Sequence, residues 1–110
     1  MEMVRFGRSG GEANAISIRI ARAVSGKSKV AICGYHGWHD WSIGGTEWNA
    51  AVPKAVAQLT HPFAYNNVTG LRDLLERVGT DVAAIIMEPV TIEQPDEGYL
   101  CLLYTADAAH

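Results

Sequence analysis

Apolar residues recur at helical spacing in two stretches of the chain. The first stretch follows a glycine-rich turn, and its apolar face consists of Ala13, Ile16, Ile20 and Val24. The second begins near Asn67, and its apolar stripe consists of Leu71, Leu74, Leu75 and Val78. Gly26 and Gly79 end the two patterns, as glycine commonly does just beyond a helix. A short third helix is predicted over residues 52–59, opened by Pro53 in its first turn.

Short apolar runs between the helical stretches predict strands. These runs cover residues 3–6, 29–33, 62–65 and 82–87. The last run is continuous in apolar residues, which predicts a central parallel strand buried on both faces. Strands that alternate with helices predict an α/β fold, with a mostly parallel sheet and flanking helices. Residues 91–98 are expected to form a loop, and residues 101–110 show little pattern.

The composition is that of a globular domain and narrows the possible partners. The chain has 110 residues, 48% of them hydrophobic and 19% charged, which corresponds to one domain at most. A net charge of −3 without any basic stripe argues against nucleic acid, and no apolar stretch is long enough to span a membrane. Cys33 and Cys101 form no disulfide or metal pattern, which predicts a reducing, cytoplasmic environment. Because motif-like sequence begins almost at Met1, we expect a piece of a longer protein.

A glycine-rich turn at residues 7–11 leads into the first helix and is a candidate phosphate site. Helix N-termini offer free N–H groups and partial positive charge, both of which favour phosphate. Ser9 can add a hydroxyl, while Gly10 and Gly11 allow the backbone to approach an anion. The turn lacks the lysine of a Walker P-loop and the spacing of a dinucleotide fingerprint. A plain helix cap is the alternative interpretation.

A loop rich in glycine and aromatic residues follows the strand at 29–33. Tyr35 can stack on a planar aromatic ligand, and His36 beside it can hydrogen-bond. Two alternatives stay open for this loop. It could hold a metal ion through His36, His39 and Asp40, although this spacing is weak. It could also simply pack its aromatic rings beneath a loop.

A carboxylate, Glu88, ends the apolar run at 82–87. Ligand sites in open α/β sheets lie at the carboxyl ends of the strands, where such a group can orient an arginine or a cofactor. A solvated Glu at the end of a strand is the alternative. Taken together, a phosphate cradle, a stacking ring and a carboxylate at strand ends suit a planar, phosphorylated, aromatic cofactor.

Four stretches of the chain, in the right order, resemble the class III (fold type I) aminotransferases that depend on pyridoxal 5′-phosphate (PLP). These stretches are VRFGRSGGEAN at 4–14, RIARAVSG at 19–26, YHGWHD at 35–40 and AIIMEPV at 84–90, with GYL following at 98–100. Within the family they most resemble glutamate-1-semialdehyde 2,1-aminomutase and its aminotransferase-like relatives. The resemblance implies that residues 1–100 are part of a large PLP-binding domain and that residues 101–110 are a divergent end.

The resemblance also implies roles for six residues in binding PLP. Ser9, Gly10 and Gly11 would hold the phosphate, Tyr35 would stack on the pyridine ring with His36 beside it, and Glu88 would support the pocket. The implied reaction is the transfer or internal migration of an amino group on an amino acid, semialdehyde or keto-sugar, in a homodimer. Two positions depart from the family pattern. Gly11 replaces the usual Thr or Ser, and Thr91-Ile92-Glu93 replaces the AGN of the aminomutase branch.

No catalytic residue is predicted, because none of the lysines Lys27, Lys29 and Lys54 has the context of the family's Schiff-base lysine. We therefore expect the chain alone to be inactive and weakly folded. Two other classes of protein are alternatives. One is a metal-dependent hydrolase that uses His36, His39, Asp40 and Glu88, and the other is a non-catalytic remnant or a split-gene subunit that pairs with a separate chain.

Overall fold

The computed structural model describes residues 2–108, which build a parallel three-stranded sheet with helices on both sides. The strands are β1 (Lys29–Cys33), β2 (Thr60–Pro62) and β3 (Val82–Met87), in the order β2-β1-β3. The helices are α1 (Gly10–Ser25), α2 (Asp40–Ile43), α3 (Lys54–Ala57), α4 (Val68–Val78) and α5 (Tyr99–Ala108), and a 3₁₀ turn η1 (Gly79–Asp81) precedes β3. Both strand pairings are parallel, so the predicted α/β fold is confirmed.

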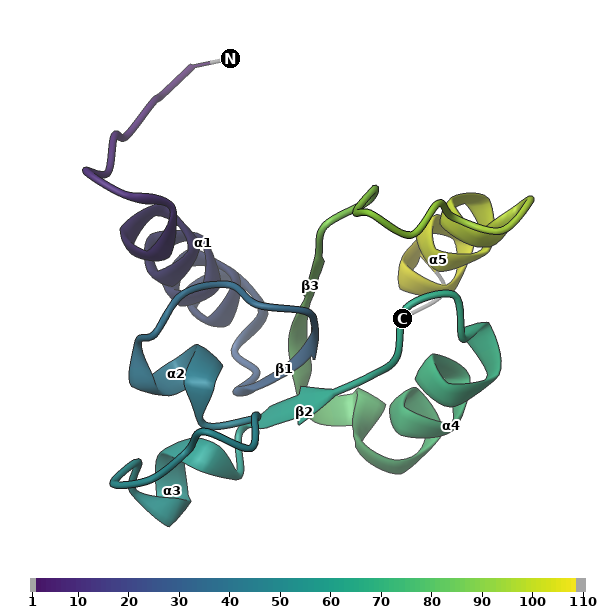
Figure 1. Ribbon diagram of the computed structural model, residues 1–110. Helices are drawn as coiled ribbons and strands as arrows, with labels where there is room; N and C mark the ends of the chain where they lie inside the picture. The colour runs from purple at the N-terminus through teal and green to yellow at the C-terminus, as the bar shows by residue number, and fades with distance from the viewer. Residues whose placement is uncertain (1, 109–110) are drawn as a thin grey trace.

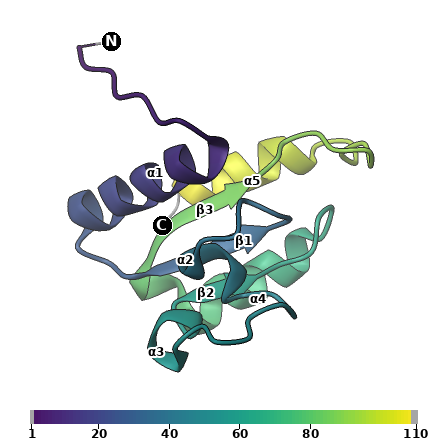
Figure 2. The ribbon, with the colours of Figure 1, turned by 60° about the vertical axis from the view of Figure 1, so that its left-hand side comes forward.

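Strand β1 is the centre of the sheet and of the core. Its side chains alternate between the two faces, and four of its five residues are buried. Ala31 and Cys33 face α4 and α5, where they join a cluster that includes Leu71 and Tyr99. Figure 1 shows α1 on the other side of the sheet, and the turned view in Figure 2 shows it running across β3. The strands therefore lie between two helical layers, and this packing holds the carboxyl ends of the strands in place.

The helix caps follow the sequence prediction. Ser9 caps α1 by accepting a hydrogen bond from the Glu12 amide at 3.2 Å, and Gly26 ends the helix in the left-handed region at φ 68°. Asn67 caps α4 through the Gly70 amide at 2.8 Å. The leucines of α4 are buried as predicted, since they are the face that meets the sheet and α5.

The predicted apolar face of α1 is wrong. Ile20 and Val24 are 55% and 83% exposed, whereas Ile18 is 4% exposed and points inward. The inward face also carries Asn14 and Ala15, which are half-buried. Small and polar residues are needed on that face because α1 lies close to β3 and to the loop after β1. The prediction from apolar spacing alone therefore chose the side of the helix that faces outward.

Three strand predictions also need correction. Residues 3–6 form no strand, because no neighbouring strand in the described chain supplies hydrogen-bond partners. The strand predicted at 62–65 lies at Thr60–Pro62, where Phe63 still donates its amide to the Ile32 carbonyl at 2.9 Å. Strand β3 is parallel as predicted, but it is an edge of the sheet among the described residues. It is consequently only half-buried rather than covered on both faces.

The C-terminal part of the chain is more regular than its pattern indicates. Residues 91–98 form the predicted loop, but helix α5 then runs across the expected boundary at residue 100. Tyr99 and Leu103 of this helix are 2% and 8% exposed and complete the core over α4. Residues 109 and 110 of the predicted divergent end lie outside the described residues.

Candidate functional site

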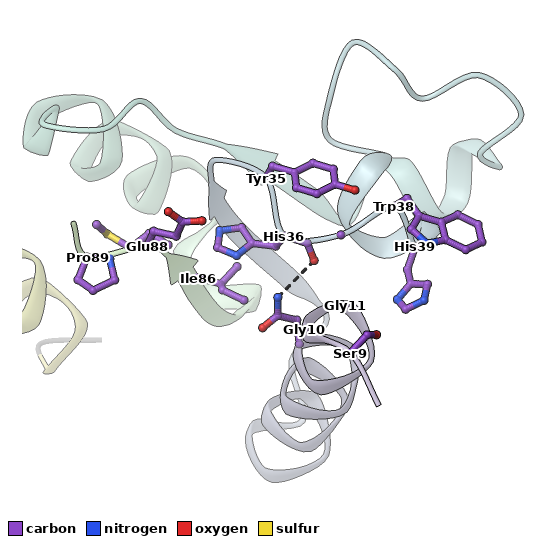
Figure 3. A pocket seen from close by; sticks show the side chains of 13 residues that line it. Ser9, Gly10, Gly11, Tyr35, His36, Trp38, His39, Ile86, Glu88 and Pro89 are labelled. Carbon is purple, nitrogen blue, oxygen red and sulfur yellow. Dashed lines mark hydrogen bonds between the residues drawn. The ribbon is translucent and has the colours of Figure 1, made fainter. Parts of the chain in front are cut away.

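A cavity of about 590 Å³ opens where β1 and β3 end and α1 begins. Its size is within the range of small-molecule sites, and the carboxyl ends of parallel strands are where open α/β sheets bind ligands. All six residues predicted to bind a cofactor line this cavity: Ser9, Gly10, Gly11, Tyr35, His36 and Glu88. Figure 3 shows them arriving from three separate segments, the start of α1, the loop after β1 and the end of β3.

The first turn of α1 has the properties of an anion site. Of the amides at the helix start, that of Glu12 is bonded by the Ser9 hydroxyl and that of Ala13 by the Ser9 carbonyl at 3.0 Å. The amides of Gly10 and Gly11 lie ahead of the first intrahelical acceptor and remain for a ligand. A Cβ on Gly10 would meet no atom within 4 Å, so the space beside this backbone is open. A phosphate group fits this arrangement.

The loop after β1 is tied to the sheet and to α1 by His36 and Asn14. His36 is 8% exposed, and its Nε2 donates a hydrogen bond to the Cys33 carbonyl at 2.7 Å. Because a carbonyl only accepts, this bond fixes the proton on Nε2. The Asn14 side-chain amide donates to the His36 carbonyl at 3.3 Å. The prediction from the sequence missed Asn14 as a site residue. Its position one helical turn after Gly10 and Gly11 could have indicated that its side chain lies near the cavity.

Tyr35 presents its ring to solvent beside the cavity. The side chain is 59% exposed, and Figure 3 shows its ring pointing away from that of His36. Gly34 before it has φ 84°, a conformation that glycine adopts without strain. A large exposed aromatic ring at a strand end has no packing role within the described residues. It is free to cover a planar ligand.

Glu88 and Pro89 form the third wall of the cavity. Glu88 is exposed, and the Pro89 carbonyl accepts a hydrogen bond from the Tyr65 hydroxyl at 2.7 Å. The loop that continues from here is held by Asn66, whose side chain donates to Glu93 Oε1 at 3.1 Å and accepts from the Asp96 amide at 2.9 Å. Asn66 has φ 59°, which asparagine tolerates better than most residues. The sequence marked Asn66 only as a helix start.

Burial and negative charge suppress ionisation next to the cavity. Burial, with the carboxylate of Glu93, raises the pKa of the Cys33 thiol. Desolvation, again with Glu93, raises the pKa of the Tyr65 hydroxyl. A thiol with a raised pKa is a poor nucleophile, so Cys33 acts here as a small core residue.

The geometry gives the alternative metal site no support. The described residues contain no group of three or more His, Cys, Asp or Glu side chains able to hold a metal ion. His36 Nε2 is already used on the Cys33 carbonyl, and Glu88 follows a different strand. The three lysines Lys27, Lys29 and Lys54 are also absent from the lining of the cavity. Lys29 begins β1, at the opposite end of the sheet from Tyr35.

Comparison with known proteins agrees with this architecture. A 3-aminobutyryl-CoA aminotransferase from Cloacimonas acidaminovorans is 36% identical over 105 residues, which cover 90% of this chain and 25% of that protein. A glutamate-1-semialdehyde 2,1-aminomutase from Desulfitobacterium hafniense is 36% identical over 121 residues, covering 96% of this chain and 28% of that protein. A solved transaminase with PLP bound superposes with a TM-score of 0.86 at 27% identity, covering 97% of this chain and 29% of that one. No family model matches the chain.

The chain belongs to the class III, fold type I family of PLP-dependent aminotransferases. It spans about a quarter of the length of the curated relatives that it matches. The family assignment and the fold expected from the sequence are thus confirmed, and both an aminotransferase and an aminomutase are among the relatives. No helix in the described part of the chain is long and apolar enough to cross a membrane.

Proposed function

We propose that this chain is the PLP-binding segment of an aminotransferase or aminomutase. The observation that carries the proposal is the convergence of Ser9, Gly10, Gly11, Tyr35, His36 and Glu88 on one cavity at the carboxyl ends of β1 and β3. When bound, PLP supplies an electron sink for chemistry at the substrate carbon that carries the amino group. The substrate of the parent enzyme would be an amino acid, a semialdehyde or a keto-sugar.

Each side of the cavity has a distinct role in this proposal. The Gly10 and Gly11 amides and the Ser9 hydroxyl would bind the phosphate, with the dipole of α1 adding favourable charge. Tyr35 would cover one face of the pyridine ring, and its exposure leaves it free to do so. His36 would support the loop beside the ring, since its Nε2 is committed to the Cys33 carbonyl. Glu88 would line the opposite wall.

We also propose that the chain alone binds PLP without turning it over. Lys27, Lys29 and Lys54 do not line the cavity, so no lysine of the chain is in place to bond the cofactor or to carry a proton at the substrate. The parent would act as a homodimer in the cytoplasm. Apolar side chains that are exposed in this chain support burial against further protein: Phe6, Val24, Trp48 and Ile92 are 90%, 83%, 74% and 105% exposed.

A titration of the chain with PLP, followed by borohydride reduction and peptide mass spectrometry, tests the proposal. Saturable PLP binding that is weakened by Ser9→Ala, with no single lysine labelled above background, is the expected result. The control Ser17→Ala removes a hydroxyl from the same helix, bonded at 2.8 Å to the Asn14 carbonyl, outside the cavity. Stoichiometric labelling of one lysine would contradict the proposal that the chain alone is inactive. Equal PLP affinity in Ser9→Ala and wild type would contradict the phosphate site.

A further inference from the structure

His39 has a ring nitrogen without a partner. Its Nδ1 is buried and makes no hydrogen bond within the part of the chain that the structure describes. The backbone of His39 has a clear task, because its carbonyl accepts from the amides of Ser42 and Ile43 at 3.0 and 2.9 Å and so begins α2. The side chain makes no capping bond. A buried polar atom left unsatisfied is costly, so an acceptor or donor is expected at this point.

The ring of His39 lies against the start of α1. A Cβ on Gly11 would be 3.4 Å from His39 Cε1 and 3.6 Å from Nδ1, so the glycine leaves just enough room for the imidazole edge. His39 and Gly11 line the same cavity, together with Ser9 and Gly10. Figure 3 shows the imidazole next to the helix start, on the side where Ser9 lies. The unpartnered nitrogen is therefore beside Gly11, in the first turn of the helix.

The cradle at this helix start is short of side-chain donors. Gly10 and Gly11 contribute only their backbone amides, which leaves the Ser9 hydroxyl as the side-chain donor of this turn, since it accepts from the Glu12 amide and keeps its own proton to donate. A phosphate carries two negative charges near neutral pH and several acceptor oxygens, and it gains most from charge-assisted hydrogen bonds. An imidazole with its proton on Nδ1 can supply one more donor at this place.

We propose that His39 binds the phosphate of the cofactor by donating a hydrogen bond from Nδ1, in the space that the missing side chain of Gly11 leaves open. This inference rests on the proposed function, because it adds a residue to the same phosphate site. His39 is a binding residue in this arrangement and takes no part in chemistry at the substrate. The ligand group that it recognises is phosphate, whether on PLP or as the free inorganic ion.

Substitutions at position 39 separate the donor from the ring. His39→Asn keeps an amide near the place of Nδ1, whereas His39→Gln carries its amide one bond further out and His39→Ala removes the donor. We expect His39→Ala and His39→Gln to lose roughly tenfold in affinity for PLP and for inorganic phosphate, as for a hydrogen bond to a charged group. The affinity of His39→Asn is expected to stay within about threefold of wild type, and a threefold change in affinity corresponds to about 0.7 kcal/mol of binding free energy.

A hydroxyl placed at position 11 provides an independent check. Gly11→Ser sets its side chain next to Nδ1 and supplies a donor at the same point, so it should restore phosphate affinity to His39→Ala. Pyridoxal, which lacks the phosphate, serves as the control ligand and should bind all variants equally. The ¹⁵N shifts of the His39 ring in the full chain, recorded with and without inorganic phosphate, report the contact directly, and Nδ1 is expected to move while Nε2 stays.

The outcomes distinguish the two proposals. If wild type binds PLP and Ser9→Ala weakens it while His39→Ala does not, the role of His39 is overturned and the PLP-binding segment stands. If His39→Ala weakens pyridoxal as much as PLP, the ring acts on the loop and not on phosphate, which also overturns the inference. If phosphate binds and moves Nδ1 but pyridoxal does not bind, His39 is confirmed and the PLP assignment fails. Failure of wild type to bind either PLP or phosphate overturns both.

Discussion

Gly37 packs directly on the backbone of Gly11. A Cβ on Gly37 would lie 3.1 Å from the Cα of Gly11, and Gly37 has φ 109°, which L side chains rarely adopt. Two glycines, 26 positions apart in sequence (37 − 11), thus let the loop after β1 approach the start of α1. This contact brings His36 and His39 to the same cavity as Ser9.

We expect Gly37→Ala to weaken PLP binding strongly. Backbone strain alone costs about 1–2 kcal/mol, and we expect the free energy of unfolding to fall by more than this. The matched control is Gly34→Ala. Gly34 also has positive φ, at 84°, but a Cβ there would meet no atom within 4 Å. In urea unfolding, Gly34→Ala reports the cost of backbone strain alone, whereas Gly37→Ala reports that strain together with the steric contact on Gly11. Equal losses in both would show that the Gly37–Gly11 contact is not needed.

Removal of the Tyr35 ring should affect the ligand and not the fold. Tyr35 is 59% exposed, so Tyr35→Ala is expected to change the free energy of unfolding by less than about 0.5 kcal/mol. Loss of ring stacking should reduce PLP affinity by up to about tenfold. Tyr35→Phe keeps the ring and should bind PLP like wild type. A fluorescence titration decides the matter, and an affinity unchanged in Tyr35→Ala would remove Tyr35 from the site.

Asn66 should control the order of the loop at 91–98. Its side chain makes three hydrogen bonds to that loop, to Glu93, to the Gln94 carbonyl and from the Asp96 amide. Asn66→Gly keeps the left-handed backbone without strain and loses only these bonds, so amide hydrogen exchange over 91–98 should accelerate. Asn66→Ala should add about 1 kcal/mol of backbone strain. Exchange that stays slow in Asn66→Gly would assign the order of the loop to other contacts.

His61 should make the chain less stable in mild acid. Burial, with the positive charges of Lys29 and Arg77, lowers the pKa of His61 below its usual 6.5. The unfolded chain therefore binds a proton more readily than the folded one as pH falls through 6.5, and stability must fall with pH across that range. The contribution is complete above 6.5 and is lost as pH drops to the folded pKa. His61→Gln should flatten this part of the stability profile, measured by urea unfolding between pH 4 and 8, and a profile as steep as that of wild type would contradict the role of His61.

The isolated chain is expected to unfold with low stability. Strand β3 is half-buried with one edge unpaired among the described residues, and several large apolar side chains face solvent. We expect a broad urea transition and a free energy of unfolding below the about 5 kcal/mol typical of stable domains. A steep, cooperative transition at high urea would contradict this expectation.

The sequence by itself determined the elements with strong local signals. The helix starts at Ser9 and Asn67, the stop at Gly26, the leucine face of α4 and the strand at 29–33 follow from capping and periodicity, which act between near neighbours in the chain. The six candidate cofactor residues, which line one cavity, were predicted in the same way, because glycine turns and polar groups at strand ends are visible locally.

Only the tertiary structure decided what depends on partners distant in sequence. It turned Ile18 rather than Ile20 inward, since the neighbours of α1 select the buried face. It made β3 an edge and left residues 3–6 unpaired, because a strand exists only where another strand supplies its hydrogen bonds. It likewise placed His39 against Gly11 and Asn14 against His36, contacts that no local pattern encodes because they form only when the loop after β1 folds back onto α1.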